Sequence, residues 1–139
     1  MQPPPTKLIV ASFLLGFCRT GSFLIPATLF PIYLVTHSIE MPNFVHSFII
    51  SFFYIPAIII LYNTPKILGT LGIKNCILGF IVPLPLSNLI LSLIVVSDKL
   101  AFLIPIMFIS RLFYGIACGF CLLYFFTLTL NLPDHFNKT

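Results

Sequence analysis

Four long apolar runs are the feature that most constrains how this chain can fold. Each exceeds the roughly 18 residues that a helix needs to cross the hydrocarbon core of a bilayer. They cover Leu8 to Val35, Phe44 to Tyr62, Cys76 to Val96 and Leu100 to Leu130. Only helices or closed barrels satisfy their backbone polar groups in lipid, and these runs lack the alternation of barrel strands. The sequence therefore predicts an all-α membrane protein with four transmembrane helices.

The composition excludes a water-soluble protein. Of the 139 residues, 59% are hydrophobic and only 7% are charged, whereas about a quarter of the residues in a soluble domain are charged. The seven Lys and Arg residues are scattered singly, which argues against a patch that binds nucleic acid. We expect the lipid bilayer to be the main partner. The protein is then an integral multi-pass protein of the plasma membrane or of a vesicle or organelle membrane.

The lysines outside the apolar runs indicate the orientation. Lys99 falls on one side of the membrane, and four lysines fall on the other: Lys7, Lys66, Lys74 and Lys138. Because Lys and Arg are enriched in cytosolic connections, we expect both termini and the connection 63–75 to face the cytosol.

Reactive residues do not form a recognisable catalytic or metal-binding set. Cys118 and Cys121 have a C-x-x-C spacing, but all four cysteines lie in apolar runs without a nearby His or acidic residue. Such cysteines usually serve as small packing residues. We find no nucleophile and base pair, no phosphate-binding loop and no metal-ligand spacing. The sequence therefore predicts a non-enzyme with no cofactor and no metal.

Two arginines lie deep inside apolar runs. Arg19 and Arg111 each lie 12 residues beyond a lysine at the membrane surface, which places both about 18 Å deep in a helix. The runs contain no Asp or Glu, and an unpaired charge at that depth costs at least about 2.5–3.5 kcal/mol. One interpretation is that they line an aqueous path and bind an anionic group. The other is that they snorkel or bond carbonyl groups freed by nearby prolines.

Small and polar residues accompany the arginines at helical spacing. Small residues predict close helix packing on the same faces: Gly16 with Arg19, and Gly115 and Gly119 with Arg111. Four polar residues are further candidates for lining a solute path, although each could instead bond a neighbouring helix: Thr20, Ser51, Tyr54 and Tyr114.

Two motifs are similar to those of the major facilitator superfamily. The segment 109–119 resembles its fourth-helix motif I-x-x-R-x-x-Q-G-x-G/A, with Arg111 and Gly115 at the strongest positions. The segment 65–74 lies where the family carries its gating-loop motif G-x-x-x-D-R-x-G-R-R/K. Gly72 and Lys74 match that motif, whereas Gly69 stands at its acidic position.

The vesicular amine transporter branch of this superfamily is the closer likeness. Phrases similar to those of the branch occur at 30–33, 48–54 and 71–74. The resemblance implies a partial amino-terminal half of a fold with twelve helices, in which helices one and four line a central cavity. It also implies proton-coupled transport of a small solute at the midplane between two halves. We then expect a truncated transporter, or one that needs a partner chain to supply the missing helices.

A second interpretation does not involve transport. A four-helix membrane subunit could dock onto a larger complex through its small and polar residues, and acidic residues of the partner would then pair with Arg19 and Arg111. A dimeric four-helix multidrug exporter would need an acidic residue in the first helix. The run Leu8 to Val35 contains none, so we exclude that class.

Overall fold

The described part of the chain is a bundle of helices. A computed structural model describes residues 6–96 and 99–131, which contain helices and no strand. Four stretches are long and apolar enough to cross a membrane: Phe13–Thr36, Asn43–Tyr62, Asn75–Val96 and Leu100–Thr127. These stretches confirm the expectation of an all-helical chain with four candidate membrane spans.

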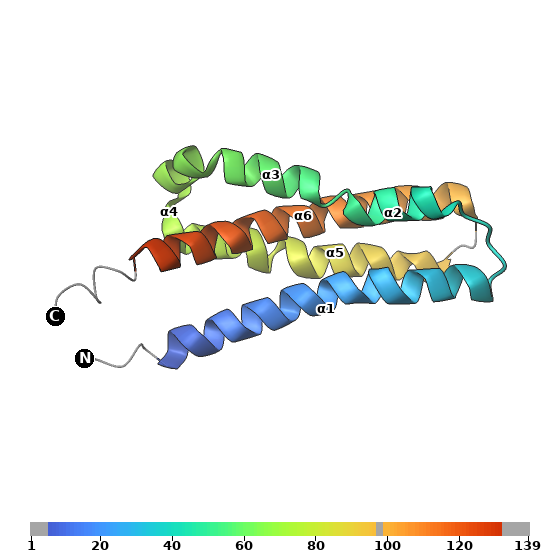
Figure 1. Ribbon diagram of the computed structural model, residues 1–139, viewed down its shortest axis with the longest axis horizontal. Helices are drawn as coiled ribbons and strands as arrows, with labels where there is room; N and C mark the ends of the chain where they lie inside the picture. The colour runs from blue at the N-terminus through green and yellow to red at the C-terminus, as the bar shows by residue number, and fades with distance from the viewer. Residues whose placement is uncertain (1–5, 97–98, 132–139) are drawn as a thin grey trace.

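Two long helices form the first and last spans. Helix α1 covers Thr6–Thr36 and α6 covers Leu100–Asn131, so each is about 45 Å long at 1.5 Å per residue. Both contain prolines and stay helical through them. Helix α1 begins at the same end of the bundle at which α6 ends (Figure 1), as an even number of crossings requires.

The second span is two helices rather than the single one expected over 44–62. Helix α2 covers Asn43–Ser51 and α3 covers Tyr54–Tyr62. Pro56 explains the break, because it has no N–H to bond the carbonyl of Phe52 and its ring clashes with that carbonyl. The two phenylalanines 52 and 53 therefore form the turn between the helices.

The third span is also segmented, and the connection that precedes it is helical. Helix α4 covers Thr64–Ile81, so most of the connection expected over 63–75 belongs to a helix. That helix is kinked at Gly72, where φ is 70° and ψ is 162°, a combination open essentially only to glycine. Helix α5 covers Pro83–Ser92, and a 3-10 turn, η1, completes the span over Leu93–Val96.

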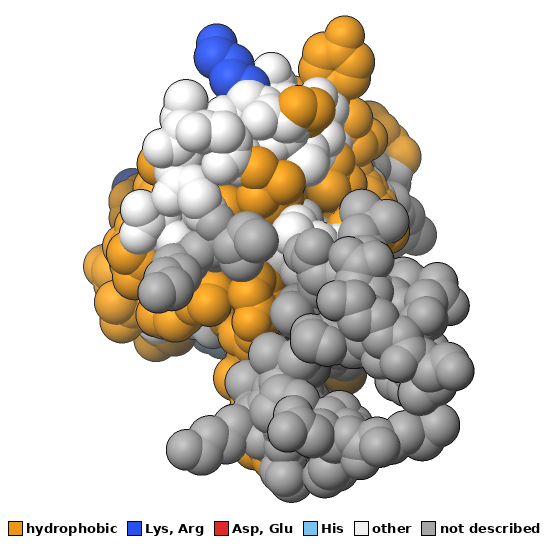
Figure 2. Space-filling model, turned by 90° about the vertical axis from the view of Figure 1, so that its left-hand side faces the viewer, with side chains coloured by type: hydrophobic (Ala, Val, Ile, Leu, Met, Phe, Trp, Pro, Cys, Tyr) orange, Lys and Arg blue, Asp and Glu red, His pale blue; other side chains and the backbone are white. Residues whose placement is uncertain are grey.

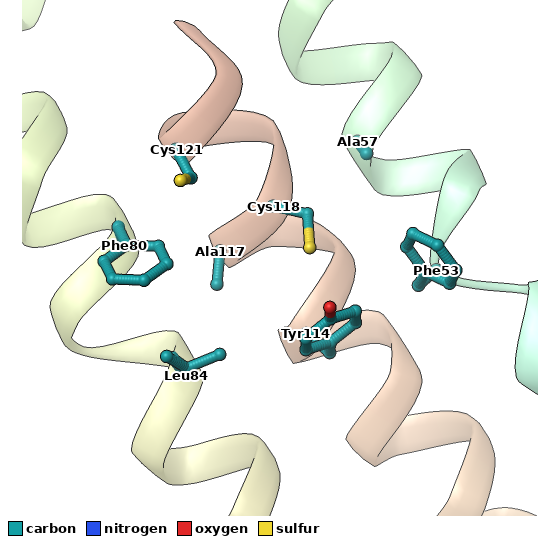
Figure 3. Close-up of a cluster of buried hydrophobic side chains, with 8 residues drawn as sticks. All are labelled: Phe53, Ala57, Phe80, Leu84, Tyr114, Ala117, Cys118 and Cys121. Atoms are coloured by element: carbon teal, nitrogen blue, oxygen red, sulfur yellow. The ribbon is translucent and has the colours of Figure 1, made fainter. Parts of the chain in front are cut away.

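Helix α6 is the central element of the bundle. It is the most buried of the four spans and packs against α3, α4 and α5. One core cluster forms around its second half (Figure 3): Phe53, Ala57, Phe80, Leu84, Tyr114, Ala117, Cys118 and Cys121. A second cluster forms around its first half: Phe30, Leu34, Ile49, Ile94, Leu103, Ile106 and Met107.

The outer surface of the bundle is apolar. Many large hydrophobic side chains are exposed on every span, and they are visible down the flanks of the bundle when it is viewed from one end (Figure 2). In water this surface would drive aggregation, whereas in a bilayer it matches the lipid chains. The surface therefore agrees with the membrane placement of the four spans.

Candidate functional site

A layer of polar residues crosses the bundle halfway along its helices. Two hydrogen bonds in it join α1 to other helices. The Tyr114 hydroxyl donates to the backbone carbonyl of Arg19 at 3.0 Å, and the Asn88 amide donates to the Ser22 hydroxyl at 3.1 Å. We call the following residues the midplane layer: Arg19, Ser22, Ser87, Asn88, Ser110, Arg111 and Tyr114. The structure thus brings both arginines of the apolar runs close to Tyr114.

Arg111 is fully enclosed by the protein. Its exposed fraction is 0%, and none of its three guanidinium nitrogens has a hydrogen-bond partner in the part of the chain that the structure describes. Its guanidinium carbon lies 5.0 Å from the centre of the Tyr114 ring, which is within the range of a cation–π contact. Buried polar groups in proteins are usually hydrogen-bonded, so this side chain calls for a specific explanation.

Arg19 approaches the same part of α6 from α1. Its side chain is half-buried and interacts electrostatically with Tyr114, Cys118 and Cys121. Tyr114 and Cys118 lie on successive turns of α6 (Figure 3). Both arginines therefore lie near Tyr114, with no described acidic residue beside them.

Aromatic rings enclose the centre of the layer. The rings of Phe23, Phe53 and Tyr114 contact one another, with centroid distances of 5.7 Å for Phe23 to Phe53, 5.3 Å for Phe53 to Tyr114 and 6.3 Å for Phe23 to Tyr114. The contacts of Phe53 with the other two rings are edge-to-face, a favourable arrangement for aromatic pairs. The Tyr114 ring that lies against Arg111 is thus packed among large apolar side chains.

Ser87 and Ser110 join α5 to α6 in a way that the sequence alone did not predict. Each hydroxyl donates to the backbone carbonyl of the other residue, at 2.9 Å from Ser87 and 3.0 Å from Ser110. Both residues are 0% exposed. The only signal in the sequence is their position next to other polar residues, Asn88 and Arg111. This reciprocal pair holds α5 and α6 in register beside the guanidinium.

The two glycines of α6 act as packing positions. A Cβ atom on Gly115 would overlap the carbonyl oxygen of Phe53 and the ring of Pro56, and one on Gly119 would lie 2.9 Å from Cβ of Ile60. The close approach of α6 to α3 and to the turn before it therefore requires the absence of a side chain. This finding agrees with the packing role expected from their spacing.

Gly16 does not have the packing role that the sequence suggested. A Cβ atom there would meet no described heavy atom within 4 Å, so no described helix packs against that position of α1. Gly79 was not expected to matter, but a Cβ atom on it would lie 2.5 Å from the Phe120 ring. Phe120 thus packs directly on the backbone of α4.

The remaining candidates lie away from the midplane layer. The Thr20 side chain is exposed and its hydroxyl bonds the carbonyl of Gly16 at 2.9 Å. Ser51 and Tyr54 flank the turn between α2 and α3 and are both exposed. Of the two gating-loop residues, Gly72 forms the kink of α4, and Lys74 follows it in the same helix with its side chain outside the described residues. Three candidates for the solute path therefore come together: Arg19, Arg111 and Tyr114.

Comparison with protein-family models, with curated proteins and with solved structures found no match for this chain. The function must therefore be argued from the midplane layer itself.

Proposed function

We propose that this chain is a four-helix part of a secondary transporter for a small solute, similar to the amino-terminal half of a major facilitator protein with both termini in the cytosol. The observation that carries the proposal is Arg111. It is a cation in the middle of a membrane span, fully enclosed and without a hydrogen-bond partner among the described residues. Ionisable residues inside membrane spans mark substrate and ion pathways.

The enclosure of Arg111 favours a solute over a docking partner. A carboxylate on another subunit could reach the half-buried Arg19 from outside the bundle. It could not reach Arg111, whose exposed fraction is 0%, unless the bundle opened. Docking to a closed bundle therefore accounts for Arg19 at most. Alternating access opens the bundle as part of its cycle, so a solute that enters at that step accounts for both arginines.

Helix α1 is the element whose movement would open the site. Most residues of the core cluster around Tyr114 belong to α3, α4, α5 and α6. Helix α1 lies at the edge of the bundle (Figure 1) and is tied to α6 by the hydrogen bond from Tyr114 to Arg19. Separation of α1 from α6 would break this bond and free the Tyr114 ring that lies against Arg111. Alternating access also requires a second bundle, so further helices, from the same protein or from a partner chain, complete the transporter.

Solute uptake by membrane vesicles tests this proposal. Vesicles from cells that make the full protein would be offered a panel of radiolabelled small organic anions and amines. We expect uptake of at least one solute to fall at least about 10-fold in Arg111→Met, and to be unchanged in Lys66→Ala, which removes an exposed cation far from the layer. The amount of each variant in the membrane is measured in parallel.

Two results would contradict the proposal. Equal uptake of every solute by Arg111→Met and the parent, at equal amounts in the membrane, would remove the role of Arg111 in transport. Loss of assembly with another chain in Arg111→Met, with no change in the flux of any solute, would favour the docking subunit instead.

The orientation is tested separately by labelling. An impermeant maleimide applied to intact cells should label a cysteine placed at Glu40 and leave one placed at Lys66 unlabelled. The reverse result would invert the topology and with it the side from which a solute enters.

A further inference from the structure

A groove leads from the surface of the bundle to the midplane layer. It lies between α1 and the segment formed by α5 and η1, has a volume of about 360 Å³, and is lined almost entirely by apolar residues. Its lining includes Tyr33 and Val95 near one end of the spans and Asn88 in the midplane layer. A volume of this size accommodates a small organic molecule. The apolar walls favour a solute with an apolar body.

Arg111 does not itself line the groove, whose lining reaches the midplane layer at Asn88. Asn88 adjoins Ser87, which bonds Ser110, and Ser110 adjoins Arg111 in the chain. The Asn88 amide also holds Ser22 of α1. A solute in the groove that displaced α1 at Ser22 would therefore reach the level of the guanidinium.

The hydrogen-bonding capacity of Arg111 specifies the charged group of the solute. Its three nitrogens need acceptors, and a carboxylate accepts two parallel hydrogen bonds from a guanidinium in a planar, bidentate arrangement. The described residues supply no carboxylate here, since the acidic residue among them, Glu40, lies in the exposed connection before α2. An amine would instead add a second positive charge to an enclosed cation.

The surroundings disfavour anions with more charge and more oxygens. The Tyr114 hydroxyl is already used as a donor to Arg19, and the rings of Phe23 and Phe53 offer no hydrogen bond. A phosphate ion would leave several oxygens unpaired among these rings, which is costly in an apolar site. A monocarboxylate has only two oxygens, and the guanidinium can satisfy both.

We infer that the solute is a small monocarboxylate with an apolar or aromatic body, which binds Arg111 through its carboxylate and places its body against the aromatic rings and the groove. This inference rests on the proposed function and names its substrate class. It departs from the amine class suggested by the motif resemblance.

Direct binding to the full protein in nanodiscs tests the inference. The probes are benzoate, acetate, inorganic phosphate and benzylamine, and the readout is binding by isothermal titration. We expect benzoate to bind most tightly, acetate more weakly for lack of a body, and phosphate and benzylamine least. Arg111→Met should weaken benzoate binding at least about 10-fold, Arg111→Lys should weaken it less because the charge remains, and Lys66→Ala should leave it unchanged. Circular dichroism checks that each variant keeps the helical content of the parent.

The outcomes separate this inference from the proposed function. Tighter binding of phosphate or benzylamine than of benzoate, or unchanged benzoate binding in the folded Arg111→Met variant, overturns the substrate class. If vesicles show uptake of an amine that depends on Arg111 while benzoate does not bind, the transport role is supported and the monocarboxylate class is wrong. If benzoate binding depends on Arg111 but vesicles transport none of the panel, the monocarboxylate class is supported and the transport role is wrong.

Discussion

Replacement of Arg111 by methionine should stabilise the protein while removing its function. The guanidinium is fully enclosed and has no hydrogen-bond partner among the described residues, so its burial opposes folding. Methionine is similar in length, flexible and apolar, and it can fill most of the same space. The substitution therefore removes the buried charge without leaving a large cavity.

The expected gain follows from two opposing contributions. A charged residue at the centre of a membrane helix costs about 2.5–3.5 kcal/mol. The contact of the guanidinium with the Tyr114 ring, at 5.0 Å, recovers up to about 2 kcal/mol when desolvated. The difference predicts that Arg111→Met raises the free energy of unfolding by about 1 kcal/mol.

Unfolding by sodium dodecyl sulfate in mixed micelles measures this difference, with helical content followed by circular dichroism. Arg19→Met serves as the matched control. Arg19 is half-buried, and its long side chain can reach polar surroundings. Its replacement should therefore change the free energy of unfolding by less than the replacement of Arg111 does. A loss of more than about 1 kcal/mol in Arg111→Met would refute the reasoning, because it would mean that the guanidinium has stabilising partners in the folded state that outweigh its burial.

Three further predictions concern the packing of the bundle and use the same unfolding assay. Gly115→Ala should lower the free energy of unfolding by about 1–3 kcal/mol, because the added methyl group overlaps the backbone of Phe53. Gly16→Ala is the control and should be neutral or stabilising, because a Cβ atom there meets no described atom. Equal effects of the two substitutions would contradict the packing seen at α6. Gly72→Ala should lower the free energy of unfolding by about 1–3 kcal/mol through backbone strain alone, since Gly72 has a φ of 70°. An unchanged free energy of unfolding would mean that this kink is absent. Ser87→Ala and Ser110→Ala should have non-additive effects on the free energy of unfolding, because their hydroxyls bond each other's residues. A double-mutant cycle should give a coupling energy of about 0.6–1.7 kcal/mol. Strictly additive effects would show that the two residues do not interact.

Hydropathy identified the spans because a bilayer imposes length and composition on each segment separately. Within the described part of the chain, the four candidate spans begin and end within five residues of the apolar runs. The breaks inside the second and third spans were harder to place. Pro56 and Pro83 are visible in the sequence, but Pro26 and Pro105 lie within continuous helices. Whether a proline breaks a span depends on the neighbours that can satisfy the freed carbonyl, and the sequence does not specify those neighbours.

The candidate site shows the same division between local and tertiary information. The depth of Arg19 and Arg111 follows from counting residues along a helix, so both could be placed at mid-membrane. Their convergence on Tyr114 depends on how α1 lies against α6. Gly16 lies three residues before Arg19 and Gly115 lies four residues after Arg111, so each is about one helical turn from its arginine. Of these two glycines, Gly115 meets a neighbouring backbone and Gly16 does not. Helical periodicity gives the face on which a residue lies but does not say which helix covers it.

The contrast between Ser110 and Arg111 links the fold to the site. These adjacent residues of α6 are both 0% exposed, but Ser110 is hydrogen-bonded reciprocally to Ser87, whereas Arg111 has no described hydrogen-bond partner. The hydrogen bonds of Ser110 fix the position of α6 against α5, and the rigid helix holds the guanidinium of Arg111 at a set depth. A flexible helix would let Arg111 turn toward water or toward a carbonyl. The unfavourable burial of the charge thus persists because the serine pair and the glycine contacts stabilise its surroundings, and it leaves a positioned cation for an anionic ligand to neutralise.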